Sequence, residues 1–422
     1  FFSRATKRLV DSTCLPRFLL STRHARSPCL AHRLLSFTPV ATTSSSQSRK
    51  QPSTQEAEAT ERKQTAVFSQ TPNATSSSSS SQTTMSRVNV VQYNILAQTL
   101  TEGIDVEDPV CVEEGPRFEK IKDKLLQQMN LEEGGGAILC LQEVSYSAAG
   151  PFHCFFNQHD YYVAWCPYGN PFSNYMGVMI AFPTARYSLL SMDFKCLADQ
   201  ISSAVNNQDD SSSSSGGNDD VNGNKRISMA EEATWVLASN RRNAMISVKL
   251  GIKGTDRSFL VATYHMPCAF RTPLVMNIHA SLLLNHLSTL TNRFVEPLII
   301  CTDGNFVPFS DCHNAFVHGV SNQLDGLGNK ELVSLVLKDY NLVDPKDRSF
   351  FSVYWKANGK EPLFTNRSKN PDEFTGTLDY IFLNPGKWNV DRVLPLPDVA
   401  TKFYPSIEEP SDHLLLMAEL TL

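Results

Sequence analysis

Residues 137–144 read AILCLQEV, an apolar run that ends at the acidic residue Glu143. Short apolar runs rich in β-branched and aromatic residues are typical of buried strands. Similar runs recur along the chain: VNVVQYNIL (88–96), MGVMIAF (176–182), AMISVKL (244–250), FLVATYH (259–265), PLIICTD (297–303), LDYIFL (378–383) and LLLMAEL (414–420). We therefore predict a strand in each.

Helical patterns separate some of these strands. A helix is predicted over 116–129, where Pro116 suits the first turn and apolar residues recur on one face. Two more are predicted at about 274–292 and 328–339. Interleaved strands and helices indicate an α/β sandwich in which helices cover the sheets.

The N-terminal part has a different composition. Residues 1–50 contain nine basic residues and one acidic residue, Asp11, and are rich in Arg, Ser and Leu. This composition predicts an organellar transit peptide, mitochondrial or chloroplast, and the alternative is a disordered basic tail in a cytoplasmic or nuclear protein. Residues 51–85 are Ser/Thr-rich and predict a disordered linker, so we expect a catalytic domain over 86–422.

A second low-complexity segment, 205–226, interrupts the domain (VNNQDDSSSSSGGNDDVNGNKR). Strands resume after it, so we predict a disordered surface insertion. No apolar run approaches the roughly 18–20 residues of a membrane span. The ten cysteines form no C-x-x-C pair, and those in apolar runs, such as Cys140 and Cys301, predict reduced core residues.

Charge is distributed unevenly. Residues 1–85 carry a net charge of +7, and because the whole chain carries −5, residues 86–422 carry −12. Nonspecific nucleic-acid binding depends on neutralisation of phosphates by Lys and Arg. An RNA substrate would therefore be held locally, by a metal and a few cations.

Polar residues cluster where the predicted strands end. These are Asn94, Glu143, His265, Asp303, Asn305, Asp379, Asp412 and His413. Groups at the ends of apolar strands can converge on one pocket. Each residue alone is weak support for a site, but their joint occurrence points to a single chemical centre.

From about Arg87 to Leu422 the chain resembles the exonuclease–endonuclease–phosphatase superfamily. Within it, the chain is similar to the branch of carbon-catabolite-repressor-type deadenylases, angel proteins and nocturnin. The resemblance is carried, in the family's order, by VQYNILAQTL, CLQEV, FTNRSKNPDEFTGTLDYIF and PSDHLLL. It implies a four-layer α/β sandwich of the DNase I type, with two mixed β-sheets flanked by helices.

The resemblance also implies a magnesium-dependent phosphodiesterase, for which Mn²⁺ may substitute as the ion. Glu143 is expected to be the principal metal ligand, with Asn94 and Asp412 in or near the metal shell. Hard carboxylate oxygens suit Mg²⁺. Asp303 would orient or deprotonate the attacking water, and Asn305 would hold a phosphate oxygen. His413, oriented by Asp379, would contact the phosphate or act as base, so the base remains open between Asp303 and His413.

Substrate contacts are expected around this centre. His265 matches a phosphate-contacting His of the family, and Asn243 matches an Asn near the site. Phe364 matches a base-stacking Phe, and Phe270 stands where relatives have Pro. The two rings could clamp a base, although Phe270 could equally pack under its own loop. Arg271, like Arg241 and Arg242, could meet phosphates or lie solvated on the surface.

Two further departures are noted. Thr302-Asp303-Gly304-Asn305 replaces a Gly-Asp-Phe-Asn motif of the family, and a family Gln is replaced by His279.

Three functions remain open. The leading hypothesis is a 3′-to-5′ exoribonuclease that shortens poly(A) and releases 5′-nucleotides. The alternative is hydrolysis of NADP(H) or of 2′,5′-oligoadenylate at the same site. The third is an inactive RNA-binding or interaction protein. The chain lacks the leucine-rich-repeat module of many family deadenylases, so docking to a deadenylase complex by that route is not expected.

Overall fold

The computed structural model describes residues 86–131, 135–169, 176–201, 229–320, 324, 330–369, 373–399 and 401–422. The predicted transit peptide (1–50), linker (51–85) and insertion (205–226) lie outside these ranges. The first described strand, β1, spans Arg87–Asn94.

The first of two six-stranded sheets, sheet A, has the strand order β13-β14-β1-β2-β4-β3. Its neighbouring strands are antiparallel except for the central parallel pair, β1 and β2. Besides β1, the strands are β2 (Ala137–Gln142), β3 (Tyr161–Tyr168), β4 (Met176–Pro183), β13 (Asn389–Val393) and β14 (Leu416–Thr421).

The second sheet, sheet B, has the order β5-β6-β7-β8-β12-β9 and also contains one central parallel pair, β7 and β8. Its strands are β5 (Tyr187–Cys196), β6 (Ala244–Ile252), β7 (Ser258–His265), β8 (Leu298–Asp303), β9 (Phe351–Ser352) and β12 (Asp379–Leu383). A separate two-stranded ribbon joins β10 (Asn366–Ser368) to β11 (Phe374–Gly376).

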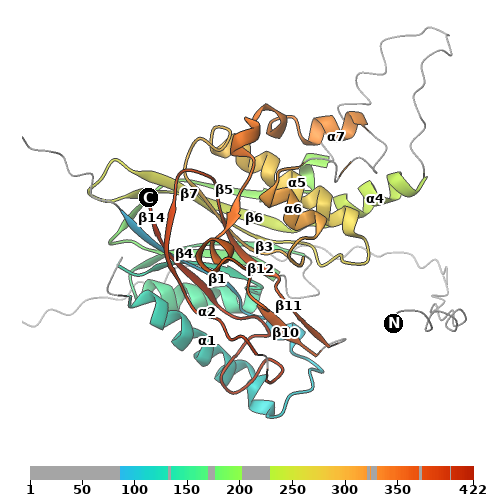
Figure 1. Ribbon diagram of the computed structural model, residues 1–422. Helices are drawn as coiled ribbons and strands as arrows, with labels where there is room; N and C mark the ends of the chain where they lie inside the picture. Colours follow the sequence, from blue (N-terminus) through green and yellow to red (C-terminus); the bar gives the residue numbers. More distant parts are fainter. Residues whose placement is uncertain are drawn as a thin grey trace, which may run out of the picture. The chain divides into compact units, whose positions relative to one another are not determined.

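Helices cover the outer faces of both sheets (Figure 1). Sheet A packs on α1 (Glu114–Met129) and α2 (Tyr146–Asn157). Sheet B packs on four helices: α4 (Met229–Ser239), α5 (Pro273–Leu290), α6 (Asp311–Val317) and α7 (Lys330–Val336). A third apolar core fills the space between the sheets and includes Val353 and Tyr354 of α8 (Val353–Asn358). The domain is therefore the expected four-layer α/β sandwich.

The inner faces of the central strands place the polar residues together. In β8, Ile299 and Cys301 lie in the core between the sheets, and Asp303 follows them on the same face because side chains alternate along a strand. The same alternation brings Asn94, Gln142, His265 and Asp379 to the inner faces of their strands. One end of the inter-sheet layer is thus apolar core and the other end is polar.

The strands predicted from apolar runs are confirmed, with small shifts at their ends. The predicted helix at 116–129 is α1, that at 274–292 is α5, and that at 328–339 is the shorter α7. Cys140 and Cys301 are free thiols in the inter-sheet core, as predicted. Within the described ranges, no helix has the length and apolar character needed to cross a bilayer.

Candidate active site

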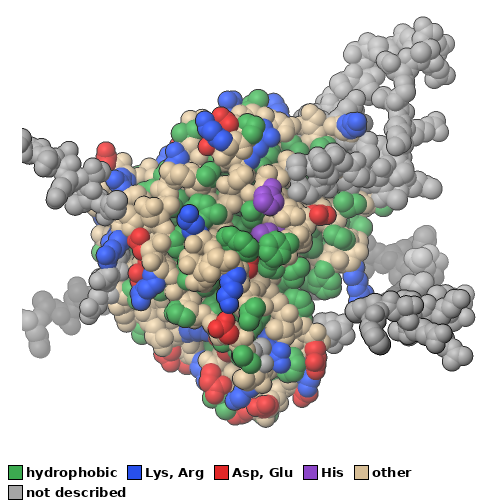
Figure 2. All heavy atoms as spheres, viewed as in Figure 1, with side chains coloured by type: hydrophobic (Ala, Val, Ile, Leu, Met, Phe, Trp, Pro, Cys, Tyr) green, Lys and Arg blue, Asp and Glu red, His purple; other side chains and the backbone are tan. Residues whose placement is uncertain are grey.

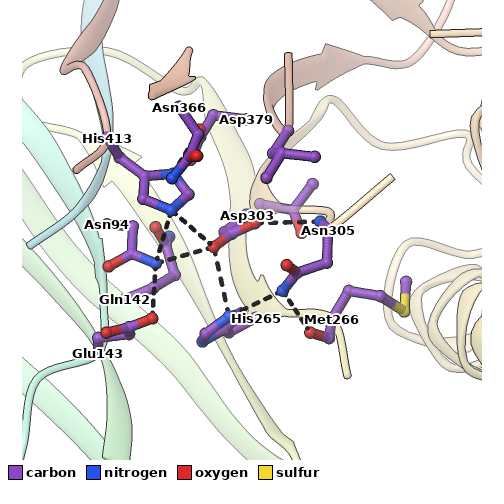
Figure 3. A network of polar contacts seen from close by, with 12 residues as sticks. Asn94, Gln142, Glu143, His265, Met266, Asp303, Asn305, Asn366, Asp379 and His413 are labelled. Carbon is purple, nitrogen blue, oxygen red and sulfur yellow. Dashed lines mark hydrogen bonds and ion pairs between the residues drawn. The ribbon is translucent and has the colours of Figure 1, made fainter. Parts of the chain in front are cut away.

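Seven of the predicted site residues meet at the polar end of the inter-sheet layer (Figure 3). They are Asn94, Glu143, His265, Asp303, Asn305, Asp379 and His413. Six are at most 7% exposed, and Asn305 is partly buried. The carboxyl ends of both parallel pairs, β1–β2 and β7–β8, lie here, which is the end of a parallel sheet where ligands bind in many α/β folds.

Asp303 is the centre of the network. One oxygen, Oδ1, accepts a hydrogen bond from the main-chain N–H of Asn305 at 3.0 Å. The other, Oδ2, accepts from the Asn94 amide at 2.8 Å and lies 3.3 Å from Nε2 of His265. It also lies 3.7 Å from Nε2 of His413, so four of the predicted residues surround this single carboxylate.

His413 lies between two carboxylates. Asp303 and Asp379 are directly opposite each other in the antiparallel β8–β12 pair. His413 Nδ1 is 2.7 Å from Oδ2 of Asp379, and its Nε2 faces Asp303. Burial alone would lower the pKa of His413, but the charges of Asp379, Asp303 and Asp412 raise it well above its ordinary value.

Glu143 directly follows β2 and lies on the side of the site that this strand forms. Its Oε2 accepts a hydrogen bond from the main-chain N–H of Ala97 at 2.8 Å, and its Oε1 accepts one from the Asn94 amide at 3.0 Å. Glu143 has a φ of +60° and Asn305 one of +50°, so both strands turn into the left-handed region at their last functional residue. This conformation is uncommon for residues other than glycine and recurs at functional sites.

Asn94 contributes its amide nitrogen to the site. Its Oδ1 accepts a hydrogen bond from the N–H of Leu96, whereas Nδ2 donates to both Glu143 and Asp303. The amide therefore orients the two carboxylates in this structure. Asn94 could bind a metal directly, one of the two expected roles, only if its amide group rotated so that the oxygen faced the site.

His265 is held on both ring nitrogens. Nδ1 is 2.5 Å from the hydroxyl of Tyr168, and Nε2 is 3.0 Å from Nδ2 of Asn305. Asn305 Nδ2 can donate to Nε2 only when that nitrogen carries no proton. The ring proton then lies on Nδ1, facing Tyr168. Burial, together with Glu143 and Asp303, raises the pKa of Tyr168 well above its ordinary value, so its hydroxyl stays neutral.

Asp412 lies at the margin of the network. Its Oδ2 accepts a hydrogen bond from Asn366 at 3.2 Å, while its Oδ1 is buried without a hydrogen-bond partner among the described residues. The residue as a whole is partly exposed, although its carboxylate points inward. Burial raises the pKa of this carboxyl to about 6, against the lowering effect of His413 and with a further contribution from Glu143.

These groups fit a divalent cation. Carboxylate or imidazole atoms of Glu143, His265 and Asp303 lie within 4.8 Å of one another, as do those of Asp303, Asp379 and His413. Where the chain is described, neither Glu143 nor Asp303 forms an ion pair with a Lys or Arg. The buried negative charge and the unpartnered oxygen of Asp412 therefore match a hard cation with oxygen ligands.

The predicted substrate-binding residues are more scattered. Asn243 donates its amide to the main-chain oxygen of His265 at 2.9 Å, so it supports the strand end. Phe270 is 65% exposed and Arg271 is also exposed. Phe364 is only 2% exposed, and no ring contact between Phe270 and Phe364 occurs in the described ranges. The ring of Phe364 is therefore buried and not open to a base, whereas its neighbour Leu363 is 59% exposed, and Phe270 does not pack under its own loop.

Several supporting residues were not predicted. Gln92 and Gln142 exchange amide hydrogen bonds at 2.6 and 2.7 Å, and Gln92 also donates to Asp379. Thr365 donates to Asp379 at 2.6 Å, and Tyr168 binds His265. Gln92 and Gln142 share the inner-face parity of their strands with Asn94 and Cys140, a signal that could have identified them.

A cavity of about 300 Å³ adjoins Glu143 on the α1 side. Its walls include the segment after β1, the start of α1 and the start of α2, with Ala97, Gly115, Ser147 and Pro151 among the lining residues. The lining is largely apolar. This volume is at the lower end of the range for small-molecule sites.

No model of a known protein family matches the chain. The chain is 24% identical to nocturnin of Mus musculus over 341 residues, which are 80% of this chain and 66% of nocturnin. It is 26% identical to 2′,5′-phosphodiesterase 12 of Bos taurus over 185 residues, covering 42% of this chain and 28% of that protein. The chain thus spans less than two thirds of the length of these curated relatives.

A solved structure of ANGEL2, a 2′,3′-cyclic phosphatase, in complex with adenosine-2′,3′-vanadate has the same fold. Its TM-score is 0.57 at 19% identity, over 80% of this chain and 96% of that one. The described sandwich, the order of the sequence motifs and these relatives agree. These relatives, together with the shared fold, support the exonuclease–endonuclease–phosphatase superfamily, and within it the branch of nocturnin, the angel proteins and the carbon catabolite repressor homologues, as the family that this chain resembles.

Proposed function

We propose that the domain is a magnesium-dependent phosphodiesterase and that its substrate is RNA, which it shortens from the 3′ end. One observation carries the phosphodiesterase assignment. Among the described residues, the buried Asp303 carboxylate accepts hydrogen bonds from neutral donors only, and it faces His265 and His413 at 3.3 and 3.7 Å, with Glu143 joined to it through Asn94.

Glu143, with Asp412 and Asp303 near it, would hold the cation. A bound magnesium ion neutralises phosphate charge and stabilises the developing charge of the transition state. His413, fixed by Asp379, can donate a hydrogen bond from Nε2 to a phosphate oxygen. Asn305 can contact the same phosphate from the other side, and His265 would do so with a proton on Nε2. An ionised Asp303 is an acceptor only, which suits it to orient and deprotonate the attacking water, so we assign the base to Asp303.

The choice of poly(A) RNA as substrate is supported by the likeness to carbon catabolite repressor and nocturnin relatives. A small nucleotide, such as NADP(H) or 2′,5′-oligoadenylate, is the second candidate. The cavity of about 300 Å³ beside Glu143 favours it, since this space could hold a nucleoside attached to the reactive phosphate.

A side-by-side assay separates these substrates. The full chain is incubated with poly(A), poly(U), 2′,5′-linked oligoadenylate or NADPH, with Mg²⁺ or with EDTA. We expect magnesium-dependent shortening of poly(A), absent in Glu143→Gln and retained in Glu102→Gln, a matched change at an exposed acid. Phosphate release from NADPH without RNA shortening would transfer the assignment to the small nucleotide. Activity in EDTA, or an active Glu143→Gln variant, would refute the metal-dependent mechanism.

A further inference from the structure

An exposed apolar cluster lies beside the segments that lead out of the site. We name it the aromatic rim. It consists of Phe309 and Trp355, 67% and 44% exposed, whose ring centroids are 5.8 Å apart. Val307, between Asn305 and Phe309 in the sequence, and Leu363, between Trp355 and Thr365, are also exposed, by 44% and 59%. On the face drawn in Figure 2, hydrophobic side chains gather over the region where Figure 1 shows α6, β11 and β12. Large exposed apolar groups that lie together commonly mark binding sites.

The backbone of Phe309 is strained. Its φ is +66°, in the left-handed region that a bulky residue rarely adopts. The ring contacts found for it in the described ranges are an edge-on contact with Trp355 at 5.8 Å and a tilted contact with His313 at 5.9 Å. A ring that is mostly exposed stabilises the fold little, so the strain is not explained by packing.

The surrounding structure holds the two rings in place. Ser310 caps α6 by accepting a hydrogen bond from the N–H of His313, and Asn314 donates its amide to the carbonyl of Phe309 at 3.3 Å. Trp355 lies on α8, whose first turn is capped by Ser352. Phe309 therefore directly precedes the capped start of α6 and Trp355 lies in the capped α8, and the two rings form a preorganised, perpendicular pair with an interplanar angle of 83°.

The rim is continuous with the candidate active site along two segments. Phe309 follows Asn305 by four residues, which span at most about 14 Å of chain. Leu363 lies two residues before Thr365, which hydrogen-bonds to Asp379. Because these two protein segments are short, a ligand whose phosphate lies at the candidate active site can extend to the aromatic rim.

We propose that the aromatic rim stacks an unpaired base of a single-stranded nucleic acid whose reactive phosphate lies at Asp303 and Glu143. Aromatic rings bind successive bases of single strands by stacking, with little dependence on sequence. Lys356, exposed on α8, adds positive charge beside Trp355 in an otherwise acidic domain, whereas Lys360, just after α8, lies 3.9 Å from the carboxylate of Asp398. This inference rests on the proposed function, and it makes a polynucleotide the substrate rather than a mononucleotide.

Binding is measured with a fluorescein-labelled single-stranded 12-nucleotide oligoadenylate by fluorescence anisotropy, in EDTA so that no hydrolysis occurs. Trp355→Ala and Phe309→Gly are each expected to weaken binding about tenfold, the loss of one stacked base. Phe194→Ala, which removes a 45% exposed ring from β5 at the opposite edge of sheet B, should stay within twofold of wild type.

Two further measurements separate recognition from folding and chemistry. Glycine relieves the left-handed strain, so Phe309→Gly should melt at the same or a higher temperature than wild type. Its turnover of bis(p-nitrophenyl) phosphate, which carries no base, should be unchanged. Unaltered oligoadenylate binding by both variants, or an equal loss in Phe194→Ala, overturns the proposal. So does a loss of bis(p-nitrophenyl) phosphate turnover, or a wild-type dimer that both variants dissociate.

The proposed function and this inference can fail separately. If the wild type hydrolyses no phosphodiester but binds oligoadenylate through Phe309 and Trp355, the phosphodiesterase assignment fails and the rim stands. If the wild type shortens poly(A) and both variants bind it normally, the rim alone is refuted.

Discussion

The buried histidine of α5, His279, gives a quantitative prediction for acid stability. The residue is fully buried, with Nδ1 2.8 Å from the hydroxyl of Tyr264 and Nε2 3.0 Å from the carbonyl of Ala238. Burial lowers its pKa from 6.5 to about 4, and the positive charge of Arg241 adds to this effect. The carbonyl of Ala238 opposes it without reversing it.

The lowered pKa of His279 determines how the stability of the protein changes with pH. Above pH 6.5 the imidazole is neutral in both the folded and the unfolded chain. As the pH falls below 6.5, the unfolded chain takes up a proton that the folded chain refuses until about pH 4. Stability is therefore lost between these values. The full loss is about 3 kcal/mol, and about 2 kcal/mol of it is reached at pH 5.

Urea unfolding at pH 7 and pH 5 measures this loss in wild type and in His279→Gln. Glutamine keeps a donor for Ala238 and an acceptor for Tyr264 but does not titrate. The free energy of unfolding should fall by about 2 kcal/mol more in wild type than in the variant. The other histidines are common to both proteins, so their contributions cancel in this difference. Equal falls in the two proteins would show that His279 is protonated in the folded state, against the reasoning from burial.

Two further substitutions test the site and the packing. Asp379→Asn places an amide against Nδ1 of His413 and disturbs its tautomer, so phosphodiester turnover should fall about 10²- to 10⁴-fold while the melting temperature of the protein changes little. An unchanged turnover would remove His413 from the mechanism. Gly177→Ala puts a Cβ 2.8 Å from the carbonyl of Val144 and closer still to the Trp165 indole nitrogen, so unfolding should become about 1–3 kcal/mol easier.

The strands that the sequence predicted are those with long apolar runs, and they form most of the two sheet centres. The sequence did not predict some strands at the edges of the sheets. The strand β5 exposes many of its residues, and β9 has only two residues, so neither carries a long apolar run. The helix α2 contains Gly150 and Pro151, which usually punctuate a helix. Its formation depends on packing against sheet A, which local propensity does not report.

The site was predictable for a related reason. A polar residue that ends an apolar strand has a known face, so the sequence could indicate that Asp303 and Asp379 share the inner layer. It could not indicate which donors meet them. Thr365 reaches Asp379 only because the β10–β11 ribbon folds over the end of β12, and Tyr168 reaches His265 across the two sheets. Likewise Leu363, and not Phe364, is the exposed member of its pair, which the sequence alone did not indicate.

The nature of these donors bears on why the site suits a cation. Asp303 and Asp379 are opposed like charges on paired strands, an arrangement that destabilises a sheet. Burial adds a desolvation cost for each carboxylate. Lys or Arg would offset both effects, yet in the described chain the direct donors to these carboxylates are amides, a hydroxyl, one main-chain N–H group and His413. Except for His413, whose raised pKa favours its positively charged form, these donors are neutral, so they satisfy the oxygens and leave part of the negative charge in place. The lack of Lys and Arg partners therefore destabilises these strand ends in the free protein, and it also preserves the negative charge that a divalent cation would neutralise.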